Sequence, residues 1–251
     1  MGDGMKRFVL LLCLCFLMGC THTIRMRSSH FNTPITSEKL FGGHFGAVGA
    51  TPTTVTLIND ITTNPPLRSE VKVNEDLKVS DLLLISNIGY DFSLGIGHSV
   101  ELTASDSEYG VKWQFLNPGA KAGSVVGAVR AGLGSKTATT STTSGDVECR
   151  ASSSITLEQG GISFGYMVKE SFVPYISYVN DSISVTTNVT NGFGAFNDYK
   201  DKGIHSITSL GFANGSPGFD YAIEYNMIDI KWDRADRKYQ NSVGFKLGAR
   251  W

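Results

Sequence analysis

Charged side chains of both signs occupy alternate positions in several stretches of this chain, with apolar residues between them. Lys112, for example, lies between Val111 and Trp113. A period of two places the charges on one face of an extended strand and the apolar residues on the other. We expect eight such charges to share an enclosed polar face. They are Glu101, Lys112, Arg130, Glu158, Asp220, Glu224, Lys246 and Arg250.

Acids and bases that share one enclosed space can play two roles. Because an unpaired buried charge costs several kcal/mol, the charges can pair with one another and fill the space. Alternatively, they can line a constriction that admits small solutes or ions. The filled interior is our preferred interpretation, and a narrow pore is the alternative.

A hydrolytic site has weaker support in the sequence. The residues that could supply a nucleophile, a general base and its acidic partner are His44, His205, Ser206, Ser209 and Asp198. Serine is common in this chain, and a histidine on a polar interior face is more often a hydrogen-bonded structural residue. We therefore expect no catalytic residue. We also expect no metal site and no cofactor, because the histidines are scattered and Cys149 stands alone in the body of the chain.

The charged positions must be held by extended strands, and the clearest strand runs from Tyr239 to Trp251. Its odd-numbered positions are apolar except for Asn241, and its even-numbered positions are small, polar or cationic. It has about the 9–11 residues that a tilted strand needs to cross a bilayer. It also ends the chain on an aromatic residue, and in this it resembles the closing strand of bacterial outer-membrane β-barrels. The resemblance is to the general class of small barrels and implies that this strand closes the sheet.

Alternation elsewhere predicts about ten strands, the first beginning near Leu40. We expect polar surface loops at about 50–80, 135–150 and 186–202. Ser153 to Met167 alternates with a change of phase at Gly160 and Gly161, which suggests a bulge. Phe172 to Val185 has mixed parity. Short turns alternating with longer loops are typical of outer-membrane barrels, and an even number of strands returns both ends of the sheet to one side.

The composition is compatible with a membrane barrel. The mean hydropathy is −0.04, because a lipid-facing and a lumen-facing side average out. Aromatic residues near strand ends, among them Tyr109, Trp113 and Tyr166, suggest interfacial girdles. A soluble β-sandwich or lipocalin-like barrel is the alternative architecture. The formal net charge of −1 argues against binding to nucleic acid.

The N-terminal segment has the features of an export signal. Lys6 and Arg7 precede an apolar stretch at 8–18, which is of signal-peptide length and too short for a comfortable spanning helix. Gly19 and Cys20 follow it. This resembles the bacterial lipobox and implies a signal peptide at 1–19, with Cys20 as the mature, lipid-carrying N-terminus. By the same resemblance, the absence of an acid directly after Cys20 indicates sorting to the outer membrane.

Together these observations predict an all-β protein, an antiparallel transmembrane β-barrel at 38–251 in the bacterial outer membrane. Residues 20–37 are expected to be a lipidated, solvated tether, with palmitate among the acyl groups on Cys20. The expected partners are outer-membrane lipids, the barrel-assembly machinery during insertion, and a surface partner of unspecified kind. The expected role is structural or surface-interaction. A narrow pore is the alternative, and an outer-membrane hydrolase is the second alternative.

Overall fold

The computed structural model describes residues 20–73, 88–119, 121–144, 147–169 and 171–251, which form β-strands, turns and irregular segments without any helix. The strands within these ranges are β1 (His22–Met26), β2 (Gly43–Ala50), β3 (Thr53–Ile58), β4 (Lys72–Val73), β5 (Ile88–Gly97), β6 (Val100–Ser105), β7 (Glu108–Leu116), β8 (Ser124–Ser144), β9 (Val147–Met167), β10 (Val173–Asn191), β11 (Gly194–Ala213), β12 (Gly218–Trp232) and β13 (Ala235–Arg250).

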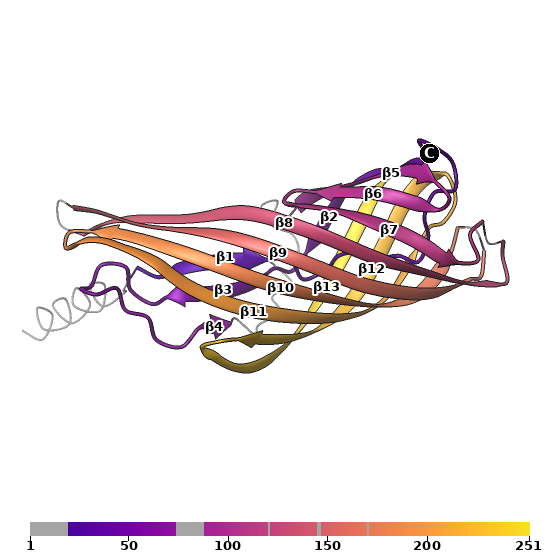
Figure 1. The fold of residues 1–251 in the computed structure, drawn as a ribbon. Helices are drawn as coiled ribbons and strands as arrows, with labels where there is room; N and C mark the ends of the chain where they lie inside the picture. The colour runs from indigo at the N-terminus through magenta and orange to yellow at the C-terminus, as the bar shows by residue number, and fades with distance from the viewer. Residues whose placement is uncertain (1–19, 74–87, 120, 145–146, 170) are drawn as a thin grey trace, which may run out of the picture.

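Ten of the described strands pair into a closed antiparallel ring (Figure 1). From β5 to β13 each strand pairs with the next along the chain, and β2 closes the ring between β13 and β5. The closure is tight, because Gly43 and Trp251 each donate a backbone hydrogen bond of 3.0 Å to the other's carbonyl. An all-β antiparallel sheet of ten strands, closed by the C-terminal strand, is therefore confirmed.

The strands of the ring differ greatly in length. β8 and β9 have 21 residues each, whereas β6 has 6 and β7 has 9. The hairpins β8–β9 and β10–β11 consequently project far beyond the rest, away from the end at which Trp251 lies (Figure 1). The expected loops at 135–150 and 186–202 are largely paired strand instead. Their many threonines explain the difference, since β-branched residues favour strands even where the outer face is polar.

One row of paired residues divides the ring into two parts. Its members occupy outward-facing positions and are partners in register from β8 to β13. They are Ala131, Gly160, Asn180, Ser206, Asp229 and Tyr239. We call this set the boundary row. The near half of the ring lies between it and Trp251, and the far half lies beyond it.

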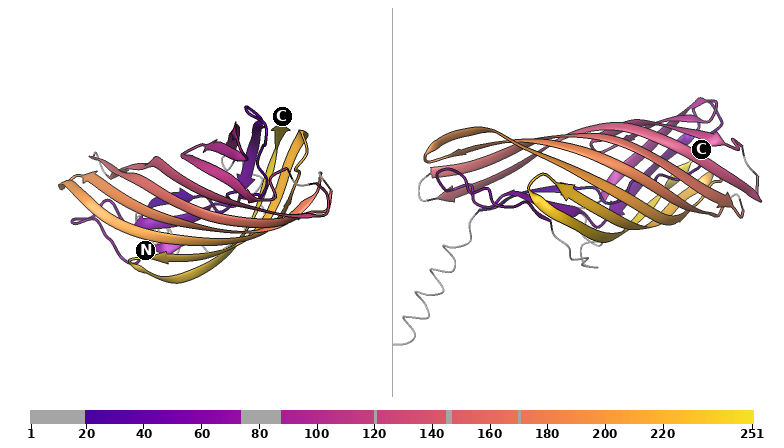
Figure 2. Two further views of the ribbon diagram at one scale, coloured as in Figure 1. Left: turned by 45° about the vertical axis from the view of Figure 1, so that its right-hand side comes forward. Right: turned by 60° about the horizontal axis from the view of Figure 1, so that its bottom comes forward.

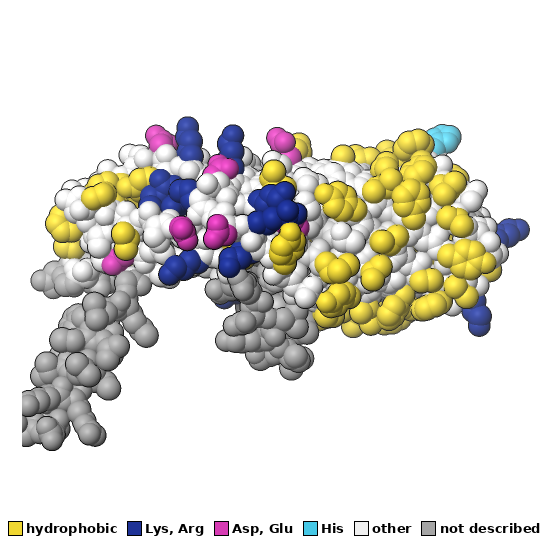
Figure 3. Space-filling model, turned by 90° about the horizontal axis from the view of Figure 1, so that it is seen from below, with side chains coloured by type: hydrophobic (Ala, Val, Ile, Leu, Met, Phe, Trp, Pro, Cys, Tyr) yellow, Lys and Arg dark blue, Asp and Glu magenta, His cyan; other side chains and the backbone are white. Residues whose placement is uncertain are grey.

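The two faces of the sheet exchange their polarity at or next to the boundary row. In the near half the outer face is apolar, with Tyr178, Leu210 and Leu247 each 45–49% exposed, and the inner face carries buried polar residues such as Ser177. In the far half the inner face is apolar, and the outer face carries Ser, Thr and charged residues. Figure 3 shows this division, with hydrophobic side chains gathered over one half and charged ones over the other.

The change of phase at Gly160 and Gly161 is this exchange of polarity, and the predicted bulge is absent. β9 pairs with β8 from Val147 to Met167 and with β10 from Arg150 to Gly165 without any register shift. Each residue keeps its side of the sheet, and only the kind of residue on that side changes. The mixed parity of β10 has the same cause, because Tyr178 faces outward in the near half whereas Ile183 faces inward in the far half.

A second sheet of three strands, in the order β1-β3-β4, lies against the concave side of the long strands (Figure 2). Ile24 of β1 and Leu57 of β3 are fully buried in one cluster with inward residues of the ring such as Ile183 and Ile230. Two apolar faces thus enclose a core between them, as in a β-sandwich. The far half therefore has the core that a water-exposed β-domain requires.

The segment between β1 and β2 returns through the interior of the ring. Residues 28–36 are all buried, so the expectation of a solvated tether is wrong for them. This passage places Cys20 beside Ile61 and against the core of the far half, on the other side of the boundary row from Trp251. The two ends of the ring itself, Gly43 and Trp251, do lie side by side.

Candidate functional site: the filled interior of the near half

The inner face of the near half surrounds residues 28–36, which we call the plug segment. Glu224 of β12 binds it at two points. Its carboxylate accepts a hydrogen bond of 2.5 Å from the Ser29 hydroxyl and one of 3.2 Å from the Phe31 amide. Tyr175 of β10 donates a third, at 2.7 Å. A fully buried carboxylate with three donors is a stable arrangement, because its charge is compensated by hydrogen bonds.

His30 occupies the centre of a second group of contacts to the plug segment. Its Nε2 lies 2.7 Å from Asp181 Oδ2, and its Nδ1 lies 3.5 Å from Glu108 Oε2. Arg130 donates to the His30 carbonyl oxygen at 3.1 Å and lies 3.7 Å from Glu108. β7, β8 and β10 therefore all hold the same turn of the plug segment.

Glycines on the ring make room for the plug segment. A β-carbon at Gly244 would lie 2.5 Å from the Ser29 hydroxyl, and one at Gly165 would lie 2.7 Å from the Pro34 ring. Both distances are too short for any side chain without displacement of the segment. The ring thus has glycine at positions where the plug segment leaves no room for a side chain.

An ion-pair network lies beside the plug segment on β12, β13 and β5. Lys246 Nζ is 3.0 Å from Asp220 and 3.7 Å from Asp91, and Arg250 Nε is 3.3 Å from the other Asp220 oxygen. All of these groups except Asp91 are less than 10% exposed. Each buried charge has an opposite charge nearby, as the energetics of buried ions require.

A third group closes the interior towards the end at Trp251. Lys112 Nζ lies 3.5 Å from Glu101, its partner across β6 and β7, and 3.3 Å from the Thr33 hydroxyl. Glu101 also accepts a hydrogen bond of 2.6 Å from the Ser37 amide. Beyond this group the described residues line an open cavity of about 420 Å³ at the mouth of the ring, between Thr36, Lys39 and Trp251.

Seven of the eight charges expected on the enclosed face do lie there, and Glu158 does not. Glu158 is exposed on the outer face of the far half, two residues beyond Gly160. The prediction placed it inside because it assumed that a bulge at Gly160 and Gly161 changes the side on which residues lie. With continuous pairing, even-numbered residues of β9 face outward along its whole length.

Sequence reasoning missed several members of the network. Asp91, Glu108 and Asp181 lie on the inner face, and their places in alternating strands could have revealed them. His30 had no such signal, because the plug segment has neither strand nor helix periodicity. Its fixed conformation comes from the ring around it.

The contacts of the residues considered for hydrolysis do not join them into one group. His205 accepts a hydrogen bond of 3.1 Å from the Trp232 indole, and Ser206 contacts Asn180 at 3.0 Å. His44 instead bridges Ser93 and Asp91 at 2.8 Å each, in the order serine, histidine, aspartate. Ser93 is fully buried, and it is not part of the lining of the cavity at the mouth of the ring.

Neither a metal site nor a membrane-spanning helix is found among the described residues. Among the described residues, no group of three or more His, Cys, Asp and Glu side chains could hold a metal ion. Within the same ranges, no helix is long and apolar enough to cross a membrane. Comparison with models of known protein families gave no match, and comparison with curated proteins gave none either.

Proposed function

We propose that this chain is an outer-membrane β-barrel protein with a closed interior, which presents its far half as an interaction domain outside the bilayer. The observation that carries the proposal is the exchange of polarity at the boundary row. An apolar outer face over a polar inner face suits lipid on the outside, and the reverse suits water on the outside. One continuous sheet has both, one beyond the other along its strands.

The lengths of the strands support the same division. The near-half parts of β12 and β13, from 218 to 228 and from 240 to 250, match the roughly 9–11 residues of a tilted spanning strand. β8 to β11 are about twice as long. Because outer-membrane barrels have short periplasmic turns and longer extracellular hairpins, the long hairpins are proposed to lie outside the cell. Insertion would then depend on the barrel-assembly machinery.

The plug segment favours an interaction role over a pore. Three groups of contacts hold it, at Glu224, at His30 and at Lys112, and ordered side chains occupy the path that a solute would take. We expect the refolded protein to show no stable conductance steps in a planar bilayer. A variant that lacks residues 20–36 should conduct, because it keeps the ten strands of the ring but loses the plug segment together with β1. Stable, ion-selective steps from the full chain would contradict the closed interior and restore the narrow pore.

Reaction with a membrane-impermeant maleimide tests the orientation in intact cells. Thr143, at the tip of the β8–β9 hairpin, and Lys121, in the β7–β8 turn at the other end, are both exposed. Each is replaced by Cys in a Cys149→Ala background, which also serves as the baseline. The proposal predicts that Thr143→Cys reacts in intact cells and that Lys121→Cys reacts only after permeabilisation. The reverse pattern would contradict it.

Lipidation of Cys20 is a separate proposal. Because the plug segment passes through the interior of the ring, Cys20 lies at the far half, and this changes the side of the membrane on which the lipid would be. With this orientation, the lipid would be attached on the outer side of the membrane, not the periplasmic side. Incorporation of labelled palmitate should be lost in a Cys20→Ser variant. Equal labelling of both proteins would show that Cys20 is not the acceptor.

Within the part of the chain that the structure describes, the order Ser93, His44 and Asp91 is the observation that favours hydrolysis. Against it, Ser93 is buried, and Asp91 also pairs with Lys246. We regard these three residues as part of the ion-pair network. A fluorophosphonate probe should therefore leave the folded protein unlabelled. Labelling that disappears in a Ser93→Ala variant would make hydrolysis the better account.

A further inference from the structure

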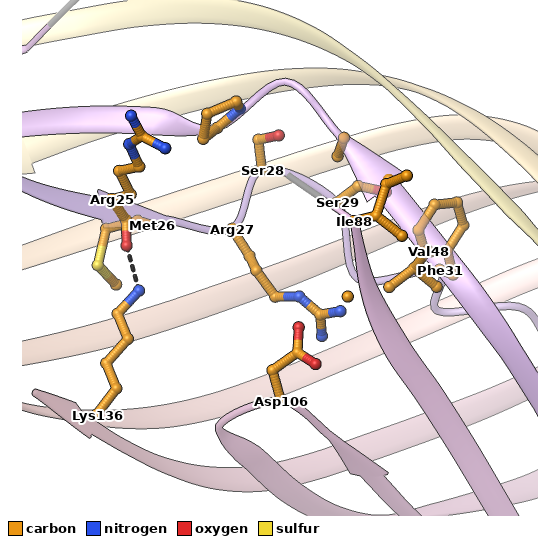
Figure 4. A pocket seen from close by; sticks show the side chains of 14 residues that line it. Arg25, Met26, Arg27, Ser28, Ser29, Phe31, Val48, Ile88, Asp106 and Lys136 are labelled. Carbon is orange, nitrogen blue, oxygen red and sulfur yellow. Dashed lines mark hydrogen bonds between the residues drawn. The ribbon is translucent and has the colours of Figure 1, made fainter. Parts of the chain in front are cut away.

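A lateral step interrupts the wall of the ring where the short strands end. The β6–β7 turn makes its last backbone hydrogen bond to β8 between the Ser135 amide and the Ser107 carbonyl, at 3.0 Å. β8 continues to Ser144 without β7 beside it. A pocket of about 150 Å³ lies at this step, between the end of β1, the end of β2 and β8 (Figure 4).

The lining of the pocket carries more positive than negative charge. Its cations are Arg25, Arg27 and Lys136, and its acid is Asp106. Arg25 is exposed. Arg27 lies 3.8 Å from Glu108, which Arg130 and His30 also approach. Figure 4 shows the Arg27 guanidinium turned towards the Asp106 carboxylate and the Arg25 guanidinium turned to the opposite side. Arg27 is therefore partly compensated, and Arg25 is the cation that has no acid beside it among the side chains labelled there.

Backbone contacts fix the frame of the pocket. Lys136 donates from Nζ to the Arg25 carbonyl oxygen, which ties β8 to β1 (Figure 4). Burial lowers the pKa of Lys136 below its usual value, so a bound anion would relieve the cost of its charge. Asp106 accepts a hydrogen bond of 3.0 Å from the Tyr90 amide and holds the β6–β7 turn. Neither contact uses the guanidinium of Arg25.

One wall of the pocket is apolar. Met26, Phe31, Val48 and Ile88 contribute to it, and Ile88 is 47% exposed. An inorganic anion gains nothing from such a wall, because only apolar surface is stabilised by contact with it. A ligand that combines an anionic group with hydrocarbon would use both sides of the pocket.

The apolar outer belt ends directly beside the pocket. Tyr109 and Leu133 are partners across β7 and β8 and are 68% and 66% exposed on the outer face. The next outward residue of β8 is Ser135. If the near half spans the bilayer, this is the depth of the lipid headgroups, where aromatic side chains collect.

We propose that the pocket binds the phosphate group of an anionic lipid, with the cationic side chains of its lining supplying the positive charge and Ile88 against the hydrocarbon next to the phosphate. The inference rests on the proposed membrane location of the near half. It names the class of lipid that the interaction domain would meet at the membrane surface.

Calorimetric titration of the purified full chain in neutral detergent tests the assignment without any need for membrane insertion. The probes are a short-chain phosphatidic acid, a short-chain phosphatidylcholine and inorganic phosphate. We expect saturable binding of phosphatidic acid, at least tenfold tighter than binding of either other probe. Arg25→Gln/Arg27→Gln should weaken it at least tenfold. Arg237→Gln, which removes a cation of β13 that pairs with Asp229 and does not line the pocket, should leave it unchanged.

The apolar wall gives a second arm to the experiment. Ile88→Asn should weaken binding of phosphatidic acid severalfold and leave any binding of phosphate unaltered. Phosphate that binds as tightly as the lipid would mean a site for the free anion and would overturn the lipid assignment. Equal binding by the double Arg variant, once a heat-modifiable gel shift shows it to be folded, would overturn the site itself. Membrane insertion is measured separately, so failure of the site is distinguishable from failure of the proposed function.

Discussion

The Ser29 hydroxyl donates to the Glu224 carboxylate at 2.5 Å, although 195 residues separate the two in the chain. This contact joins the plug segment to the wall of the ring at mid-height, where Tyr175 and the Phe31 amide complete the set of donors. The interior of the ring is therefore a specific packing arrangement, and its parts can be tested one at a time.

Glu224→Gln should destabilise the protein by about 2 kcal/mol, because each donor loses a charged acceptor and one of them meets an amide hydrogen instead. Glu158→Gln is the matched control, with the same chemical change on the exposed outer face, where substitutions stay within about 0.5 kcal/mol. Urea midpoints followed by tryptophan fluorescence measure both. Equal effects of the two substitutions would contradict the placement of Glu158 outside and Glu224 inside.

Lys246 and Asp220 should behave as an energetically coupled pair. Lys246→Met removes one of two cations at Asp220 and should cost about 2 kcal/mol, since Arg250 remains. Asp220→Asn/Lys246→Met should cost less than the sum of the two single substitutions, by about 1–3 kcal/mol. A double-mutant cycle by urea unfolding gives this coupling, and additive losses would mean that the pair contributes no mutual stabilisation.

Gly244→Val should displace the plug segment, because a β-carbon there overlaps Ser29. The expected results are conductance steps in a planar bilayer and a loss of stability of about 1–3 kcal/mol. Gly160→Val is the control, since a β-carbon at Gly160 has no neighbour within 4 Å. A silent and fully stable Gly244→Val protein would show that the segment does not pack against this wall.

The far half should lose stability in mild acid through His22. Its ring is fully buried between Thr140 and Ser153, at 2.9 and 2.7 Å, and burial lowers its pKa to about 4. The unfolded chain takes up the proton at about pH 6.5. Stability from the neutral ring is therefore complete above pH 6.5 and is lost as the pH falls towards 4.

The His22→Gln variant isolates this contribution. Between pH 7 and 4.5 the wild-type protein should lose about 2–3 kcal/mol relative to the variant. Thermal unfolding monitored by the fluorescence of Trp232, in the same far-half core, measures the difference in variants that lack the other two tryptophans. A difference that does not change with pH would contradict the buried neutral ring.

The ring was predictable because strand alternation is a local property of the sequence. Val111, Trp113 and Lys112 specify two faces whatever surrounds them, and Trp251 marks the closing strand. The exchange of polarity was visible in the sequence but ambiguous, because a bulge at Gly160 and an exchange of environment produce the same pattern of apolar and polar residues. Only the pairing of β9 with both of its neighbours separates the two, and pairing is a property of the whole sheet.

The plug segment could not be predicted from its own residues. Ser28 to Thr36 is mostly polar and aperiodic, which is typical of a linker. Its burial depends on groups far away in the chain, such as Glu224 and Asp181, and on space left by Gly165 and Gly244. The ring did contain a sign of this burial, in its unexplained glycines and its excess of inward-facing acids. The segment that these residues contact could not be identified from the sequence.

Quenching of tryptophan fluorescence by lipids brominated on their acyl chains is the most direct test of the central claim, that the near half spans the bilayer and the far half lies outside it. The chain has three tryptophans. Trp113 points outward in the near half and is 50% exposed, whereas Trp232 is buried in the far-half core. In variants that each retain one of these, refolded into brominated vesicles, Trp113 should be strongly quenched and Trp232 should not. Quenching of Trp232, or a Trp113 that only a water-soluble quencher reaches, would contradict the account.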